Sequence, residues 1–136
     1  MKTVFILVIA FFCAANAMYT YTPEWKNCTN SDLMSFEMHN VTIDEPPVAG
    51  QVSHFHLCGY NKEIWLISIR TLHITSSPNV VDQTVFYYSG VTWKQTACWD
   101  ANITIPEGAP KTFTLNFDFM SLIRGRVGCA EVTVNL

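Results

Sequence analysis

Two segments near the end of the chain, at positions 112–120 and 130–136, alternate strictly between apolar and polar residues. Their apolar members are Phe113, Leu115, Phe117 and Phe119 in the first and Ala130, Val132, Val134 and Leu136 in the second. Successive side chains of a β-strand point to opposite faces of the sheet, so a period of two places the apolar members of each segment on one face. The pattern predicts two β-strands, each with one face in a hydrophobic core and the other in solvent.

The remaining segments have the same β-rich character. Short runs of Val, Ile, Thr and aromatic residues are separated by turn residues, and no stretch has the 3.6-residue period of an amphipathic helix. Further strands are expected at positions 52–60, 64–75, 84–88 and 102–105. The run at 64–75 is long and mostly apolar, which is typical of a central strand covered on both faces. About seven or eight strands at this spacing predict an all-β sandwich or barrel.

One candidate strand changes its parity. Phe36 and Met38 would lie on one face, whereas Val41 and Ile43 have the opposite parity. A bulge near His39 would bring both pairs to the same face, because a bulge inserts one extra residue into a strand.

The beginning of the chain has the pattern of a secretory signal peptide. Lys2 precedes an unbroken apolar run at positions 4–12, and Ala15 and Ala17 are small residues at the cleavage-signal positions. The run is shorter than the roughly 20 apolar residues of a membrane-spanning helix. We therefore expect a signal peptide at residues 1–17 and one mature domain at 18–136. The expected location is extracellular, with the endosomal or lysosomal lumen as an alternative.

Composition narrows the classes of partner. The formal net charge of −3, without a basic tract, argues against nucleic acid and against an electrostatic membrane anchor. Hydrophobic residues make up 49% of the chain and charged residues only 14%, which makes an interior filled by an apolar ligand worth considering.

Cysteines and sequons fit an exported protein. Four cysteines follow the predicted signal peptide, namely Cys28, Cys58, Cys98 and Cys129. An even number in a secreted domain predicts two disulfides, and the sequence alone allows three ways of pairing them. Asn27, Asn40 and Asn102 begin N-glycosylation sequons, which predicts a glycoprotein.

Catalytic and metal-binding patterns are weak. His54, His56 and Cys58 share one face of a strand and could chelate zinc, but two surface histidines beside a disulfide cysteine are the favoured interpretation. The sequence contains no G-x-S-x-G elbow, phosphate loop or EF-hand pattern. We expect no enzyme activity, no metal and no cofactor. Because the chain has four histidines, cargo release in an acidic compartment is a further hypothesis.

Several spaced motifs resemble those of one family. They are the Trp25-Lys26-Asn27-Cys28 opening, the strand, proline turn and glycine at 41–50, and the glycine-bearing turn at 124–128 followed by Cys129 and a closing strand. Together they resemble the ML (MD-2-related lipid-recognition) domain family, and most closely its GM2-activator and Niemann–Pick C2-like branch. A third disulfide and a Cys-Pro element, which many members carry, are not visible in this sequence.

The resemblance implies a fold and a function. It implies an immunoglobulin-like β-sandwich of two antiparallel sheets with an apolar cavity between them, in which a sterol, phospholipid, glycolipid or fatty acid binds. It also implies pairing of the first and last cysteines, Cys28 with Cys129, which leaves Cys58 with Cys98. Combined with the alternation, it makes these the expected lipid-binding residues: Phe36, Trp65, Ile67, Ile69, Phe113, Leu115, Phe117, Phe119, Val132 and Val134.

The main alternative is a true immunoglobulin domain acting in adhesion or receptor interaction. Such a domain has a Trp about a dozen residues after its first cysteine and a Tyr-x-Cys corner. Here Trp65 follows Cys58 by seven residues, and Thr96 stands where the corner tyrosine would be. We therefore favour a secreted lipid-binding and lipid-transfer protein over the adhesion module, and a protein receptor remains a candidate partner.

Overall fold

The computed structural model describes residues 20–28 and 34–136. The predicted signal peptide at 1–17 lies outside this range. Among the described residues the regular elements are all β-strands: β1 (Glu24–Asn27), β2 (Phe36–Ile43), β3 (Val52–Asn61), β4 (Ile67–Ser77), β5 (Asp82–Val91), β6 (Thr96–Thr104), β7 (Thr112–Ser121) and β8 (Gly125–Asn135). In this part of the chain no helix is long and apolar enough to cross a membrane.

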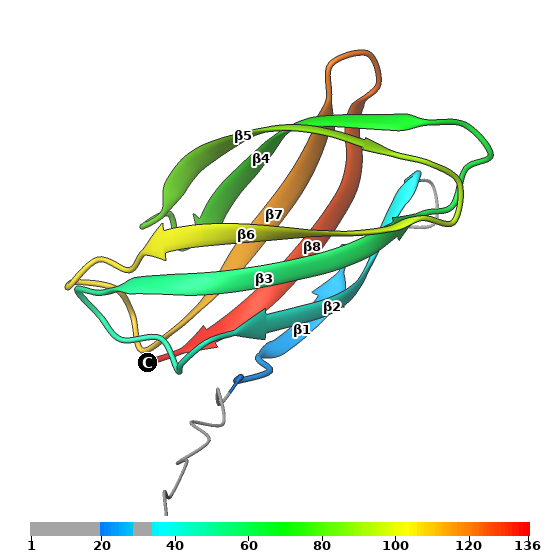
Figure 1. Cartoon of the computed structure of the whole chain (residues 1–136). Helices are drawn as coiled ribbons and strands as arrows, with labels where there is room; N and C mark the ends of the chain where they lie inside the picture. The colour runs from blue at the N-terminus through cyan, green and yellow to red at the C-terminus, as the bar shows by residue number, and fades with distance from the viewer. Residues whose placement is uncertain (1–19, 29–33) are drawn as a thin grey trace, which may run out of the picture.

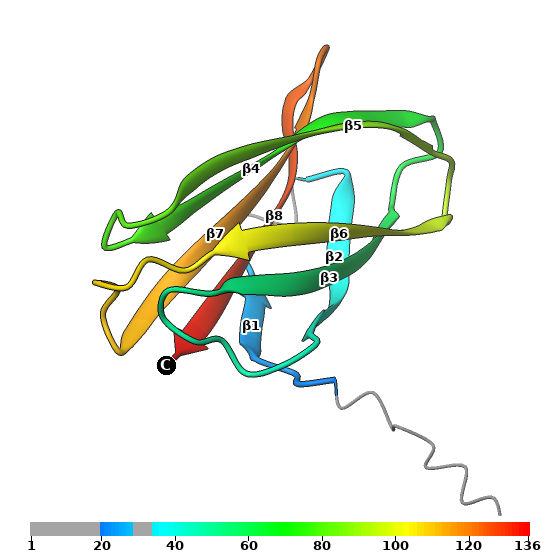
Figure 2. The same cartoon turned by 60° about the vertical axis from the view of Figure 1, so that its left-hand side comes forward.

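The strands form two antiparallel sheets that face each other. The larger sheet has the order β1-β8-β7-β4-β5 and the smaller has the order β2-β3-β6 (Figures 1 and 2). All pairs in both sheets are antiparallel. The prediction of a β-sandwich with two antiparallel sheets is confirmed.

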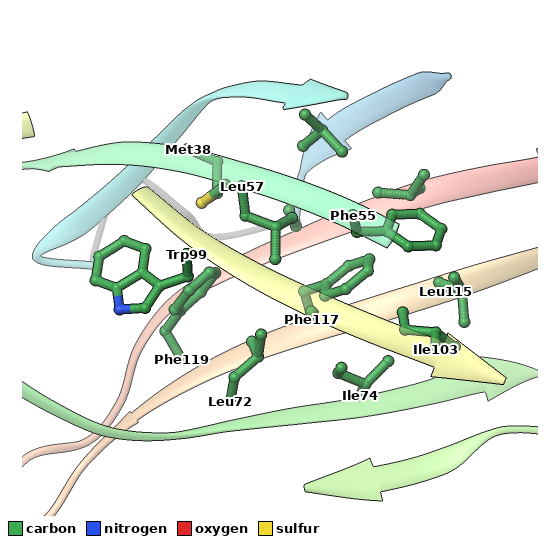
Figure 3. Close-up of a cluster of buried hydrophobic side chains, with 14 of the residues drawn as sticks. Met38, Phe55, Leu57, Leu72, Ile74, Trp99, Ile103, Leu115, Phe117 and Phe119 are labelled. Carbon is green, nitrogen blue, oxygen red and sulfur yellow. The ribbon is translucent and has the colours of Figure 1, made fainter. Parts of the chain in front are cut away.

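The predicted alternation determines what lies between the sheets. Phe113, Leu115, Phe117 and Phe119 of β7 are at most 2% exposed, and the polar residues between them face outward. Their aromatic rings meet rings of the smaller sheet: Phe117 lies 5.6 Å from Phe55, and Phe119 lies 5.2 Å from Phe36. Figure 3 shows Phe117 beside Phe55 and Phe119 beside Trp99 in the space between the sheets. One continuous core therefore joins the sheets.

The change of parity in β2 has the expected cause. The pairing of β2 with β3 shifts between Met38 and Asn40, which is the signature of a bulge at His39. The shift allows Phe36, Met38, Val41 and Ile43 all to be buried, each at most 1% exposed. The predicted bulge is confirmed.

The long apolar run at 64–75 corresponds only in part to a strand. β4 begins at Ile67, whereas Ile64, Trp65 and Leu66 lie before it and are 73%, 45% and 61% exposed. β4 is central, between β5 and β7, but its outer face is open to solvent at Arg70. The prediction of a strand covered on both faces was wrong, because the apolar residues that suggested a second buried face belong to a loop.

Two disulfides stabilise the sandwich. Cys28 is bonded to Cys129 across 101 positions of sequence, and Cys58 is bonded to Cys98 across 40. The first ties the chain after β1 to β8, and the second joins the paired strands β3 and β6. This is the pairing that the family resemblance implied.

Candidate functional site

The space between the sheets is the candidate binding site. Nine of the ten residues predicted to bind lipid lie there and are at most 2% exposed: Phe36, Ile67, Ile69, Phe113, Leu115, Phe117, Phe119, Val132 and Val134. They come from β2, β4, β7 and β8, so both sheets contribute. The tenth, Trp65, is 45% exposed in the β3–β4 connection, where the Arg124 guanidinium lies 4.8 Å from the ring centre. The prediction that Trp65 faces the core was wrong.

The sequence interpretation missed most of the wall contributed by the smaller sheet. Phe55 and Leu57 on β3, and Trp99 and Ala101 on β6, are at most 5% exposed and belong to the same buried core as the apolar residues of β4 and β7. Figure 3 shows Phe55, Leu57 and Trp99 near Phe117 and Phe119. The signal was present in the sequence, since residues 99, 101, 103 and 105 are apolar and alternate with polar or charged residues. The sequence interpretation had recognised only the second half of this alternation, at Ile103 and Ile105.

The interior consists of apolar side chains in direct contact. Phe36, Trp99 and Phe119 form a cluster with ring centres 5.1 to 5.4 Å apart. Three surface depressions among the described residues are lined by other side chains, for example Asp44, Glu45 and His54 beside the β2–β3 turn. A ligand between the sheets would therefore have to displace these side chains or separate the sheets.

One edge of the sandwich is closed tightly, where β1 and β8 of the larger sheet meet β2 of the smaller. The Asn27 side chain donates to the Met38 carbonyl at 3.0 Å and accepts from the Met38 amide at 3.2 Å. Phe36 packs directly on the backbone of β8: a Cβ added to Gly128 would lie 2.9 Å from Phe36 Cδ1. Gly128 therefore permits the two sheets to approach closely at this edge.

The opposite edge, between β5 and β6, is held by side chains. The Gln83 amide donates to the Asn102 carbonyl at 2.7 Å, and the Tyr87 hydroxyl donates to the Asp100 carbonyl at 2.6 Å. Burial, with a smaller contribution from the nearby Asp100 charge, raises the pKa of Tyr87, so its hydroxyl keeps its proton at physiological pH. Since β5 and β6 do not pair with each other, these bonds bridge two separate sheets.

The histidine and cysteine motif on β3 has a structural role. Cys58 is in a disulfide, so its thiolate is not available to a metal. His56 lies between two carboxylates, with Nδ1 2.5 Å from Asp100 and Nε2 2.5 Å from Asp44. Hydrogen bonds to Asp100 and then Asp44 raise the pKa of His56. An imidazolium can donate from both ring nitrogens, so the protonated form suits this position.

The three sequons differ in their surroundings. Asn40 and Asn102 are exposed on β2 and β6. Asn27 is only partly exposed, and its side-chain nitrogen is bonded to Met38. A glycan on Asn27 would replace a hydrogen of that nitrogen beside the closed edge, whereas Asn40 and Asn102 face solvent.

Comparisons with known proteins identify the fold. No protein-family model and no curated protein matches the sequence. The structure is similar to a Niemann–Pick type C2 protein from the Japanese carpenter ant, with a TM-score of 0.56 over 82% of this chain and 98% of that chain, at 6% identity. It is also similar to chicken MD-1 in complex with lipid IVa, with a TM-score of 0.51 over 87% of this chain and 98% of that chain, at 13% identity. The chain therefore has the ML-type β-sandwich fold, as the sequence motifs implied.

Proposed function

We propose that this protein is a secreted carrier that binds the apolar part of a lipid between its two sheets. The observation that supports the proposal most strongly is the interior itself, whose walls on both sheets are apolar and aromatic. Chicken MD-1, which shares the fold, forms a complex with lipid IVa. The carrier would shield the lipid from water and transfer it without covalent chemistry.

The chemistry of the interior favours an acyl chain or a sterol body as the buried part. The described buried polar residues, Ser35, Ser53, Asn61, Ser76 and Ser121, lie at or near the ends of strands rather than among the rings at the centre. A charged headgroup would lose its hydration at that centre without gaining a partner, so it would remain at the rim. At about 25 cal/mol per Å² of apolar surface, burial of a chain is favourable enough to offset moderate ordering costs.

Entry would require the β5–β6 edge to open. The bonds made by Gln83 and Tyr87 cross this edge through side chains alone, so they can exchange with water as the strands separate. The edge formed by β1, β2 and β8 would act as the hinge.

We further propose that Asn40 and Asn102 carry glycans after export, while Asn27 does not.

Native mass spectrometry of the secreted protein tests the carrier function. The expected result is a protein mass with an added lipid mass, which organic extraction removes and a fatty acid or sterol restores. A protein that is free of lipid and takes up neither probe would overturn the proposal and favour the adhesion module.

A matched pair of variants locates the site. Leu115→Trp places a bulky indole ring in the interior, whereas Asn116→Trp places the same ring on the outer face of the same strand. We expect roughly tenfold or greater loss of fatty-acid affinity for the first and unchanged affinity for the second. Thermal unfolding checks that both are folded, and Val132→Phe on β8 replaces Leu115→Trp if that variant does not fold.

A further inference from the structure

The two disulfides differ in how far they reach solvent. Cys28 and Cys129 are 9% and 3% exposed, so their bond is almost wholly covered. Cys98 is exposed and Cys58 is partly exposed. An attacking thiolate must reach a sulfur atom, and exposed disulfides are the ones that external thiols reduce most readily. The Cys58–Cys98 disulfide is therefore the one that is open to chemistry from outside the protein.

The Cys58–Cys98 disulfide lies on the outer face of the smaller sheet. Cys58 and Cys98 stand directly opposite each other in the antiparallel pairing of β3 with β6. Their neighbours Leu57 and Trp99 are buried in the core. Because side chains alternate between the two faces of a strand, the cysteine side chains point outward. The bond therefore crosses from one strand to the next at the surface, apart from the apolar interior.

The order of the strands makes Cys98 the sulfur that is more open to attack. β6 is an outer strand of the three-stranded sheet, whereas β3 lies between β6 and β2 (Figures 1 and 2). A thiolate attacks in line with the sulfur–sulfur bond, so it approaches Cys98 from beyond β6 and Cys58 from above β2. On β2 the residue paired with Cys58 is Asn40, an exposed sequon asparagine that would carry a glycan. Attack at Cys98 avoids this side chain.

We propose that the Cys58–Cys98 disulfide is a thiol-exchange site, which an external thiol reduces by attack at Cys98. The attacking thiolate forms a bond to Cys98 Sγ, and the electron pair of the broken bond leaves on Cys58 Sγ, which takes up the proton that the attacking thiol lost. A second thiol attacks the mixed disulfide and releases Cys98, which is protonated in the same way. Two external thiols, or the two thiols of one dithiol, are thereby oxidised to a disulfide while the protein disulfide is reduced to two thiols.

Reduction should loosen β6 without unfolding the sandwich. Nine consecutive residues of β3 pair with β6, and this backbone pairing does not depend on the disulfide. Two residues beyond Cys98, the Asp100 carbonyl accepts the Tyr87 hydrogen bond that joins the sheets at the β5–β6 edge. A looser β6 would weaken that bond, so the exchange site would control the opening of the edge through which lipid would enter. This consequence rests on the proposed carrier function, whereas the exchange chemistry does not.

Limited reduction of the secreted protein tests the exchange site. The protein is treated with increasing dithiothreitol under native conditions, alkylated with N-ethylmaleimide and mapped by peptide mass spectrometry. Cys58 and Cys98 should be alkylated at a dithiothreitol concentration roughly tenfold or more below the one that Cys28 and Cys129 require. With glutathione and an acid quench, the glutathione adduct should form mainly on Cys98. Reduction of both disulfides together, or of Cys28–Cys129 first, would overturn the proposal, and an equal or larger adduct on Cys58 would overturn the choice of the attacked sulfur.

Lipid uptake before and after selective reduction tests the consequence. Reduction should speed the uptake of a fluorescent fatty acid several-fold, and reoxidation should restore the original rate. Cys58→Ser/Cys98→Ser is the matched control, which should take up the probe at the faster rate and show no response to dithiothreitol. If circular dichroism shows that this variant is unfolded, wild-type protein alkylated at Cys58 and Cys98 replaces it.

The outcomes separate this inference from the carrier function. An equal uptake rate in the oxidised and reduced wild type, or unfolding of the selectively reduced protein, would overturn the link to lipid entry. A protein that binds no fatty acid in either state would contradict the carrier function, and the alkylation experiment would still decide the exchange site.

Discussion

The two edges of the sandwich are held by different kinds of interaction. Where β1, β2 and β8 meet, the Asn27 side chain bonds to the β2 backbone and Phe36 packs on Gly128, while the Cys28–Cys129 disulfide joins the chain after β1 to β8 within the larger sheet. Between β5 and β6 the sheets are joined by the Gln83 and Tyr87 side chains. Close packing fixes the distance between the two sheets, whereas partly exposed hydrogen bonds are replaced by water at small cost. The two edges therefore differ in how directly the sheets contact each other, which is the basis for proposing that the β5–β6 edge is the one that opens.

The largest expected loss of unfolding free energy comes from removing the Cys28–Cys129 disulfide. Replacing Cys28 and Cys129 by Ser should lower the free energy of unfolding by about 5 kcal/mol, against about 4 kcal/mol for Cys58 and Cys98, because the first closes the longer loop. Urea unfolding of the two double variants measures both values. If the Cys58 and Cys98 replacement proves the more costly, the length of the closed loop is not what decides the two contributions.

The next effect concerns the close approach of the sheets at Gly128. Gly128→Ala adds a Cβ 2.9 Å from Phe36 Cδ1 and from the Phe36 carbonyl oxygen, so we expect a loss of about 2 kcal/mol of unfolding free energy. Gly108→Ala is the matched control, because its added Cβ has no atom within 4 Å. Chemical denaturation compares them, and equal stabilities would show that the closed edge yields easily.

A smaller loss of unfolding free energy is expected at the β5–β6 edge. Gln83→Ala combined with Tyr87→Phe removes both hydrogen bonds to β6 and should cost about 1 to 2 kcal/mol. The same double variant should take up a fluorescent fatty acid faster, because less must be broken to separate β5 from β6. Stopped-flow fluorescence measures the rate, with Thr84→Ala on the outer face of β5 as control. An unchanged uptake rate would argue for a different entry route.

The smallest effect is the pH dependence contributed by His56. Its pKa is raised in the folded state by Asp100 and Asp44, so its stabilising contribution is complete below the unfolded pKa of about 6.5 and is lost as pH rises through the folded pKa. His56→Gln should therefore lower stability by less than about 1 kcal/mol in acid and by nearly nothing at alkaline pH, since the group is partly exposed. Thermal unfolding across pH checks this. A larger loss at alkaline pH would contradict it.

The sign of this effect bears on the hypothesis of acid-triggered cargo release. His56 joins Asp44, after β2, to Asp100 on β6, so its protonation tightens the smaller sheet. Loosening in acid would have to come from other groups. Acid release remains a prediction that lipid affinity at neutral and acidic pH can test.

The local hydropathy pattern was sufficient to predict the strands that bury only one face. The alternation in β7 and β8 predicted which side chains are buried, because the period of a strand is a local property. The parity change at His39 predicted the β2 bulge for the same reason. The pattern gave a wrong prediction at Ile64, Trp65 and Leu66. These three apolar residues continue the apolar run of β4 in the sequence, but they are exposed and lie before the strand begins. An apolar residue in a loop has the same hydropathy as one in a strand.

Hydropathy and residue spacing predicted strands with one apolar face, and hence an apolar interior, and the spaced motifs carried the resemblance that implied the ML-type fold and the cysteine pairing. The packing of the two sheets decides that one edge is closed by direct contact and the other is bridged by side chains, and it brings three distant connections to one end of the strands. These features depend on contacts between residues far apart in the chain, such as Phe36 with Gly128 and Trp65 with Arg124. Hydropathy and spacing describe neighbours along the chain, and such contacts arise only when the sheets pack.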